Sequence, residues 1–292
     1  MNPHPPAPSC YRHPDRPTGL ACTRCGRSAC PECLRSASVG QHCVDCVAQG
    51  QKDVRQVRTV GGATLSRNPV PFVTYALIAV NVVIYGITAL EAGNLMDNRA
   101  SSLFRAWRLV PAFVGDGEWF RVVGSGFLHY GLIHLLVNML ALYLLGPYCE
   151  VALGRTRFLA VYLASLLGGS AAVMALVDPL TATVGASGAI YGLFGAVAVI
   201  MLRTRQNMTQ IAVLLAINLF ISVSVPGISL WAHLGGLAAG TLSTAGILYL
   251  PRLLRARTQS TASAIGWGSV AAVVVLALVV SVLAAPTVIV IN

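Results

Sequence analysis

The chain has 292 residues, of which 10% are charged and 55% are apolar. A soluble globular protein carries roughly 25% charged residues, so this composition excludes a soluble enzyme and indicates a membrane protein. Its 20 basic and 10 acidic side chains give a net charge of +10, and every acidic residue lies at or before Asp178. Residues 179–292 therefore cannot supply the aspartate of a catalytic triad or an intramembrane aspartate pair.

The N-terminal 46 residues hold seven of the eight cysteines. Together with one histidine they form four pairs, each with two residues between its members: Cys10 and His13, Cys22 and Cys25, Cys30 and Cys33, and Cys43 and Cys46. This spacing lets both members of a pair bind one ion from a tight turn, and eight ligands fill two tetrahedral zinc sites. His42, next to Cys43, is an alternative eighth ligand. We expect residues 1–46 to form a small head that holds two structural zinc ions.

The lengths between these pairs, 8, 4 and 9 residues, resemble those of B-box-type zinc fingers. The resemblance implies that the first pair shares an ion with the third, and the second with the fourth. A disulfide cluster is the alternative, but disulfides are rare in the reducing cytosol, where the distribution of basic residues places the head. As the partner of the head, we favour a protein over a nucleic acid.

Residues 47–69 are polar and indicate a linker, after which apolar segments follow. A membrane span needs about 20 mostly apolar residues and must be helical, because hydrocarbon offers no partner to an open backbone donor. The seven predicted spans are residues 70–90, 127–148, 157–177, 186–203, 209–226, 229–250 and 264–285. The stretch 91–126 mixes arginine with tryptophan, which is typical of a segment in the headgroup zone. We expect an all-α polytopic membrane protein, with a six-helix core over residues 70–250 and an inner loop and seventh transmembrane helix over residues 251–292.

The basic residues are distributed unevenly between the two sides of this predicted membrane protein. With the N-terminus in the cytoplasm, nine basic residues before position 70 and seven in later loops lie inside, which is 16 of the 20. The other four lie in residues 91–126. Because cytoplasmic loops carry an excess of Lys and Arg, we predict a cytoplasmic N-terminus, an outer C-terminus and a location in a bacterial plasma membrane.

Polar side chains inside predicted spans are functional candidates, because each is costly in the bilayer unless it is satisfied. The second span contains His129, His134 and Asn138. His134 and Asn138 are four residues apart, so they lie on one helix face, one turn from each other. This arrangement indicates hydrogen-bond donors aimed at a common point.

Gly185 directly precedes the fourth span, which contains Ser187, Gly188, Tyr191 and Gly192. A serine in a membrane helix usually bonds the carbonyl one turn back or a neighbouring helix. Here glycines flank Ser187 and allow close backbone approach. The free N–H groups of a helix start can also support negative charge.

The sixth span contains His233, Gly236 and Gly240 on one face. Gly236 and Gly240 form a small-residue strip for close helix contact, which matches the glycine strip of the fourth span. If the two strips pack together, His233 and Ser187 meet near the outer ends of their helices.

Four pieces of sequence together resemble the rhomboid family of intramembrane serine proteases, over about residues 70–250. They are Gly117-Glu-Trp-Phe-Arg121, His129 with His134-x3-Asn138, Gly185-Ala-Ser-Gly188, and Ala232-His-Leu-Gly-Gly236. The family's Trp-Arg pair is Trp-Phe-Arg here. The resemblance implies a six-helix core, with the seventh segment as an extra C-terminal helix.

The same resemblance implies roles for individual residues. Ser187 would be the nucleophile and His233 the general base, with Tyr191 packed against His233. His134 and Asn138 would form the oxyanion hole with the Ser187 backbone N–H. The implied substrates are transmembrane segments of membrane proteins with small residues near the cleaved bond.

The chemistry expected of this site is that of a Ser-His dyad without a catalytic cofactor, since no carboxylate follows Asp178 to complete a triad. Water must reach Ser187, so the helices should enclose a polar cavity. Two other classes are a catalytically inactive rhomboid relative that binds clients and a polytopic transporter or scaffold. The intact Ser187 and His233 disfavour the first, and the lack of internal repeats disfavours the second.

Overall fold

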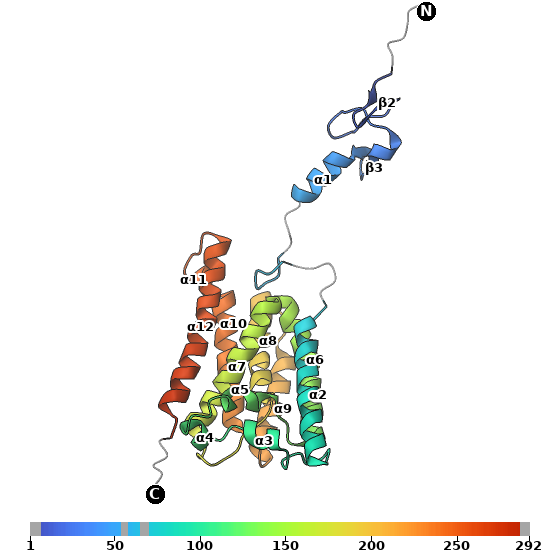
Figure 1. The fold of residues 1–292 in the computed structure, drawn as a ribbon. Helices are drawn as coiled ribbons and strands as arrows, with labels where there is room; N and C mark the ends of the chain where they lie inside the picture. Colours follow the sequence, from blue (N-terminus) through green and yellow to red (C-terminus); the bar gives the residue numbers. More distant parts are fainter. Residues whose placement is uncertain (1–6, 54–57, 65–69, 287–292) are drawn as a thin grey trace, which may run out of the picture. The chain divides into compact units, whose positions relative to one another are not determined.

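The structure of the chain is a computed structural model that describes residues 7–53, 58–64 and 70–286 (Figure 1). It divides into two compact units, Met1–Val57 and Arg58–Asn292. The division falls within residues 47–69, the segment that the composition indicates as a linker.

The N-terminal unit consists of two small antiparallel hairpins and a helix. Its elements are β1 (Ser9–Cys10), β2 (His13–Pro17), a 3-10 turn η1 (Pro31–Cys33), β3 (Leu34–Ser36), β4 (Gln41–Cys43) and α1 (Val44–Asp53). Five cysteines make up most of its buried apolar interior, with Ala29 and Leu34. An interior built of thiols predicts that metal ligation, rather than apolar burial, stabilises this unit.

Helix α1 continues past the expected end of the head. We expected the linker to begin at residue 47, but α1 runs on to Asp53. The segment after Cys46 is polar, which indicated a linker, yet its Ala, Gln and Lys residues are good helix formers.

All seven apolar segments of the C-terminal unit form helices. They are α2 (Phe72–Ala92), α6 (Gly131–Leu153), α7 (Arg155–Leu176), α8 (Ser187–Thr204), α9 (Thr209–Ser224), α10 (Leu230–Leu248) and α12 (Gln259–Leu283). Among the described residues, five helices are long and apolar enough to cross a membrane, namely α2, α6, α7, α8 and α12. Helix α9 has only 16 residues. Helix α10 is less apolar because it carries a histidine, hydroxyl side chains and glycines. For these two helices, crossing the membrane stays a prediction.

The stretch 91–126 contains no long helix, as its composition predicts. It forms the short helices α3 (Ser102–Trp107), α4 (Pro111–Gly115) and α5 (Arg121–Gly124), and the turn η2 (Ser125–Phe127) lies at its end. Arg121 is buried here. It pairs with Glu118 at 2.6 Å and donates to the backbone carbonyls of Arg105 and Arg108 at 2.8 and 2.9 Å. One guanidinium therefore holds three parts of this segment together.

Helix α8 is the most buried of the candidate spans, and it packs against α10 through two strips of glycine. A Cβ on Gly236 would overlap the carbonyl of Gly188, and a Cβ on Gly240 would overlap the backbone of Gly192. The structure thus confirms the predicted close contact of the two strips. Helix α12 lies along α7 and α10 (Figure 1).

The N-terminal end of α2 is capped by a side chain from α6. The buried Glu150 carboxylate accepts hydrogen bonds from the backbone N–H groups of Val73 and Thr74, at 3.0 and 2.8 Å, and from the Thr74 hydroxyl at 2.8 Å. These bonds satisfy N–H groups that a helix start leaves open. Glu150, the only acidic residue of α6, therefore has a structural role as a cap of α2.

Candidate active site and metal centres

Ser187 is the first residue of α8. The loop just before it contains a position, Gly185, that favours glycine. Gly185 has a φ of +132°, and a Cβ there would lie 3.0 Å from the imidazole of His134. The chain can therefore pass closely over His134 before α8 begins. Because the first N–H groups of a helix have no intrahelical acceptor, Ser187 sits beside open backbone donors.

The structure brings Ser187 and His233 together, as predicted from the packing of the glycine strips. His233 lies near the start of α10 and is 5% exposed. Its Nε2 lies 2.8 Å from the Ser187 Oγ. A hydroxyl and an imidazole nitrogen at this distance can exchange a proton.

Two further side chains fix the imidazole of His233. The Tyr191 ring stacks on it with the ring centroids 4.0 Å apart and the planes 9° apart, the contact that the family resemblance implies. The Ser222 Oγ, on α9, lies 2.7 Å from His233 Nδ1. The role of Ser222 is not visible in the sequence, because nothing there distinguishes it from other serines in apolar helices.

His134 and Asn138 occupy the first turns of α6, as predicted, and His134 faces Gly185. The backbone N–H of Tyr130 donates to His134 Nδ1 at 3.1 Å. A neutral His134 must therefore carry its proton on Nε2, the atom that faces Gly185. Asn138 donates from Nδ2 to the His134 carbonyl at 2.9 Å, which leaves its second amide N–H free to donate elsewhere.

His129 lies in the loop before α6, and not inside the helix as we had expected, and it packs against His134. Its side chain is fully buried, and its ring meets the His134 ring edge-on with the centroids 5.1 Å apart. Neither of its ring nitrogens has a hydrogen-bond partner among the described residues. The contact limits how far the His134 ring can turn.

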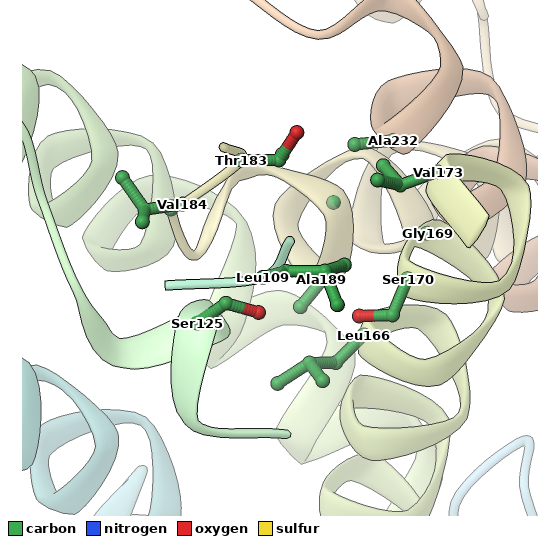
Figure 2. Close-up of a pocket in the computed structure, with 13 residues that line it drawn as sticks. Leu109, Ser125, Leu166, Gly169, Ser170, Val173, Thr183, Val184, Ala189 and Ala232 are labelled. Carbon is green, nitrogen blue, oxygen red and sulfur yellow. The ribbon is translucent and has the colours of Figure 1, made fainter. Parts of the chain in front are cut away.

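A small cavity of about 20 Å³ lies next to the Ser187 loop (Figure 2). Gly185 and Gly188 line it, and the hydroxyls of Ser125 and Ser170 point toward each other across it. A cavity needs roughly 10–15 Å³ of such space to hold one water molecule. The cavity therefore has room for one water molecule, with the hydroxyls of Ser125 and Ser170 as polar groups in its lining.

The N-terminal unit contains two clusters of four ligand atoms each, in which all atoms lie within 4.8 Å of one another. The first cluster is Cys10, His13, Cys30 and Cys33, and the second is Cys22, Cys25, Cys43 and Cys46. The structure thus groups the first pair with the third and the second with the fourth, as the B-box resemblance implies. Cys43 belongs to the second cluster, whereas His42 belongs to neither.

The spacing of the ligand atoms fits a tetrahedral zinc ion. Zn–S and Zn–N bonds of about 2.3 and 2.0 Å require S···S separations of about 3.8 Å and S···N separations of about 3.5 Å. The sulfurs of Cys25 and Cys43 are 3.8 Å apart. The Nδ1 of His13 lies 3.5 Å from the sulfurs of both Cys30 and Cys33. Both clusters are therefore shaped to bind a metal ion.

Backbone and arginine N–H groups point at the second cluster. The Cys43 N–H donates to the Cys22 sulfur at 3.2 Å, and Arg27 Nε donates to the Cys25 sulfur at 3.5 Å. Such contacts favour the thiolate form, which is the form that binds metal.

Comparison with known proteins places the membrane unit in a family. Residues 116–250 match the family model described as the Rhomboid domain. The chain is 32% identical over 190 residues to the rhomboid protease GluP of Bacillus subtilis (strain 168), which covers 63% of this chain and 36% of that protein. It is 38% identical over 135 residues to the putative rhomboid protease YdcA of the same organism, covering 44% of this chain and 67% of that one. The rhomboid protease AarA of Providencia stuartii is 26% identical over 211 residues, 62% of this chain and 74% of AarA. This chain therefore belongs to the rhomboid family.

Proposed function

We propose that this protein is an intramembrane serine endopeptidase that cleaves transmembrane segments of other membrane proteins. The observation that carries the proposal is the 2.8 Å contact between Ser187 Oγ and His233 Nε2 at the start of two tightly packed helices. Relatives named as rhomboid proteases support the same activity. The chain spans about a third of the length of GluP, 36%, so the proposed activity rests on the residues of this chain.

In the first half of the reaction, Ser187 attacks the scissile carbonyl carbon. His233 Nε2 accepts the hydroxyl proton as the new C–O bond forms. It then returns that proton to the leaving amine, and the C–N bond breaks to give an ester on Ser187. Water attacks the ester in the second half, with His233 again accepting a proton. His233 then returns this proton to the Ser187 oxygen as the ester C–O bond breaks, which releases the acid product and restores the hydroxyl. The cavity lined by Ser125 and Ser170 has room for one water molecule.

The oxyanion of the tetrahedral intermediate needs donors that are already in place. The Nε2–H of His134, the second N–H of Asn138 and the backbone N–H of Ser187 supply them. Removal of one such donor costs roughly 3–4 kcal/mol in other serine proteases. His134 is the best prepared of the three, because Tyr130 fixes its tautomer from the other side of the ring.

The base works as one half of a dyad. Residues after Asp178 contain no carboxylate, and the second ring nitrogen of His233 faces the Ser222 hydroxyl instead. Asp178 itself accepts a hydrogen bond from the Leu180 N–H within its own turn, at 2.9 Å. In this proposal the imidazole of His233 therefore works with a neutral partner at Nδ1.

The two clusters of the head, in this proposal, bind zinc as a structural ion. Their donor sets of one nitrogen and three sulfurs, and of four sulfurs, are those of closed structural sites with no open position for a substrate. When bound, the ions supply the cross-links that so small an interior lacks. We place the head in the cytoplasm, because 16 of the 20 basic residues then lie on the inner side.

A serine-reactive fluorophosphonate probe tests the proposed activity. Purified protein in detergent or liposomes should be labelled at Ser187 and should cleave a transmembrane substrate, and Ser187→Ala should abolish both. Ser281→Ala is the matched control, because Ser281 lies on α12 and its hydroxyl donates to the Ala277 carbonyl of the same helix at 2.9 Å. Folded wild-type protein that neither binds the probe nor cleaves would contradict the proposal and favour an inactive, client-binding relative.

A further inference from the structure

Ser222 is the one polar residue of α9 whose side chain is buried. Within α9, whose residues are all described, only Ile211 and Ser222 are buried. The Ser222 Oγ lies 2.7 Å from the Asn218 carbonyl, 2.8 Å from the Tyr191 hydroxyl and 2.7 Å from His233 Nδ1. One hydroxyl thus contacts three groups, two of which belong to the site around Ser187.

Counting protons assigns a direction to each of these contacts. A hydroxyl carries one hydrogen and two acceptor lone pairs. The Asn218 carbonyl can only accept, so the Ser222 hydrogen goes to it. The Tyr191 hydroxyl and His233 Nδ1 must then both donate to Ser222.

The same count fixes the tautomer of His233. A neutral imidazole has a single N–H, and here it lies on Nδ1. The lone pair of Nε2 is then free to accept the Ser187 proton across 2.8 Å. For a neutral ring, this assignment is the one that satisfies all four contacts together.

We propose that Ser222 is a positioning residue that holds His233 in the tautomer able to act as a base. The proposal rests on the protease function proposed above. In a triad the carboxylate holds the imidazole in the correct tautomer and stabilises the imidazolium. Ser222 provides the first of these effects through a neutral acceptor. Its O–H dipole, directed at the Asn218 carbonyl, also presents the oxygen to the Nδ1–H when the ring becomes charged.

A neutral acceptor suits this location. A buried carboxylate would be costly inside a membrane protein, whereas a hydroxyl satisfied by a helix carbonyl carries little such cost. The stacked Tyr191 ring holds the imidazole plane, and its hydroxyl fills the remaining lone pair of Ser222.

The mutational test separates the hydroxyl from the volume of the side chain. Threonine and valine have the same shape, but only threonine keeps the hydroxyl. We expect Ser222→Val and Ser222→Ala to lower kcat on the order of 10–100-fold with KM within about 2-fold, a smaller loss than the roughly 10⁴-fold seen when a triad aspartate is replaced. Ser222→Thr should stay within about 3-fold of the wild type. Ser224→Ala, on the exposed side of the same helix, should have no effect.

A spectroscopic test applies to the unmodified protein. In protein labelled with ¹⁵N-histidine, the imidazole signals that disappear in His233→Asn belong to His233. We expect these signals to show the proton on Nδ1 at neutral pH. A proton on Nε2 in the wild type would overturn the proposal, whether or not any variant folds.

The outcomes keep the two proposals apart. An active wild type with Ser222→Val at full rate, or with Ser222→Thr and Ser222→Val equally impaired, would overturn the role of Ser222 and leave the protease function intact. A folded wild type without activity would overturn the protease function, and the catalytic role of Ser222 with it.

Discussion

Replacing Gly185 by alanine tests whether the oxyanion donor is held in place by the loop before Ser187. A Cβ at this position would lie 3.0 Å from both Cε1 and Nε2 of His134 and 3.4 Å from the Ser187 Oγ. The His134 ring would have to move by a few tenths of an ångström. His129 packs against that ring, and the Tyr130 N–H is hydrogen-bonded to its Nδ1. Any shift of the ring would therefore move its Nε2–H away from the position in which it can donate to the oxyanion.

The size of the effect follows from two contributions. An alanine at a φ of +132° costs about 1–3 kcal/mol of backbone strain, which lowers stability but not the rate of the folded enzyme. Loss of one oxyanion donor costs roughly 3–4 kcal/mol, which corresponds to a rate lower by about 10²–10³-fold. We therefore expect Gly185→Ala to reduce both the melting temperature and the cleavage rate.

Gly117→Ala is the matched control. Gly117 has a φ of +101°, and nothing lies within 4 Å of the Cβ that it would gain. It should lower the melting temperature by a similar amount while the cleavage rate per folded molecule stays within about 3-fold. Melting temperature and initial rate on a transmembrane substrate are measured for both variants. Full activity in Gly185→Ala, or an equal loss of rate in Gly117→Ala, would refute the reasoning.

Three further predictions concern the dyad, the missing carboxylate and the head. Ser187→Ala and His233→Ala should each abolish cleavage, and the double variant should be no worse than either. The reason is that mutations of residues that act as a unit have strongly non-additive effects on the rate. An additive loss in steady-state rates would argue against a dyad. Asp178→Asn should cleave at close to the wild-type rate, since its carboxylate accepts from its own turn, and a loss as large as that of His233→Ala in folded protein would point to a hidden triad. Elemental analysis should find two zinc ions per chain, and the Cys10→Ser variant should lose one of them. The control variant Cys149→Ser should keep both, because the Cys149 thiol is buried in the C-terminal unit. A metal-free preparation with the head resistant to proteolysis would contradict that assignment.

The helices of the membrane unit could be predicted from sequence because hydrocarbon leaves the backbone no other spanning structure. The pairing of α8 with α10 was also predictable, since glycines four residues apart mark the face along which two helices can approach. Those two inferences bring Ser187 and His233 together without any further information. The sequence was less informative about α10 as a span, because the polar residues that make the site also make the helix less apolar.

Ser222 could not be predicted, because the sequence of α9 does not show which of its faces turns inward. Helix α9 carries no strip of small residues to show which face it turns inward, and it contains both Ser222 and Ser224. Only the rotation of the helix decides which serine is buried. In the head, neighbouring His42 and Cys43 posed a similar choice, and the β3–β4 hairpin decides it. Alternate residues of a strand face opposite sides, and Cys43 is fully buried opposite Leu34, whereas His42 pairs with Arg35.

The proposed mechanism requires two histidines, His134 and His233, with opposite hydrogen-bonding properties at Nε2. His134 must donate a hydrogen bond from Nε2, and the Tyr130 N–H brings this about by occupying Nδ1 as a donor. His233 must accept at Nε2, and in our proposal Ser222 brings this about by occupying Nδ1 as an acceptor. The hydrogen-bond partner of Nδ1 therefore determines the role of each histidine, as surroundings do in other enzymes that use two identical side chains for different steps. Neutral partners are sufficient for both assignments, so a chain without a carboxylate after Asp178 can prepare a base and an oxyanion donor while avoiding the cost of a buried charge in the membrane.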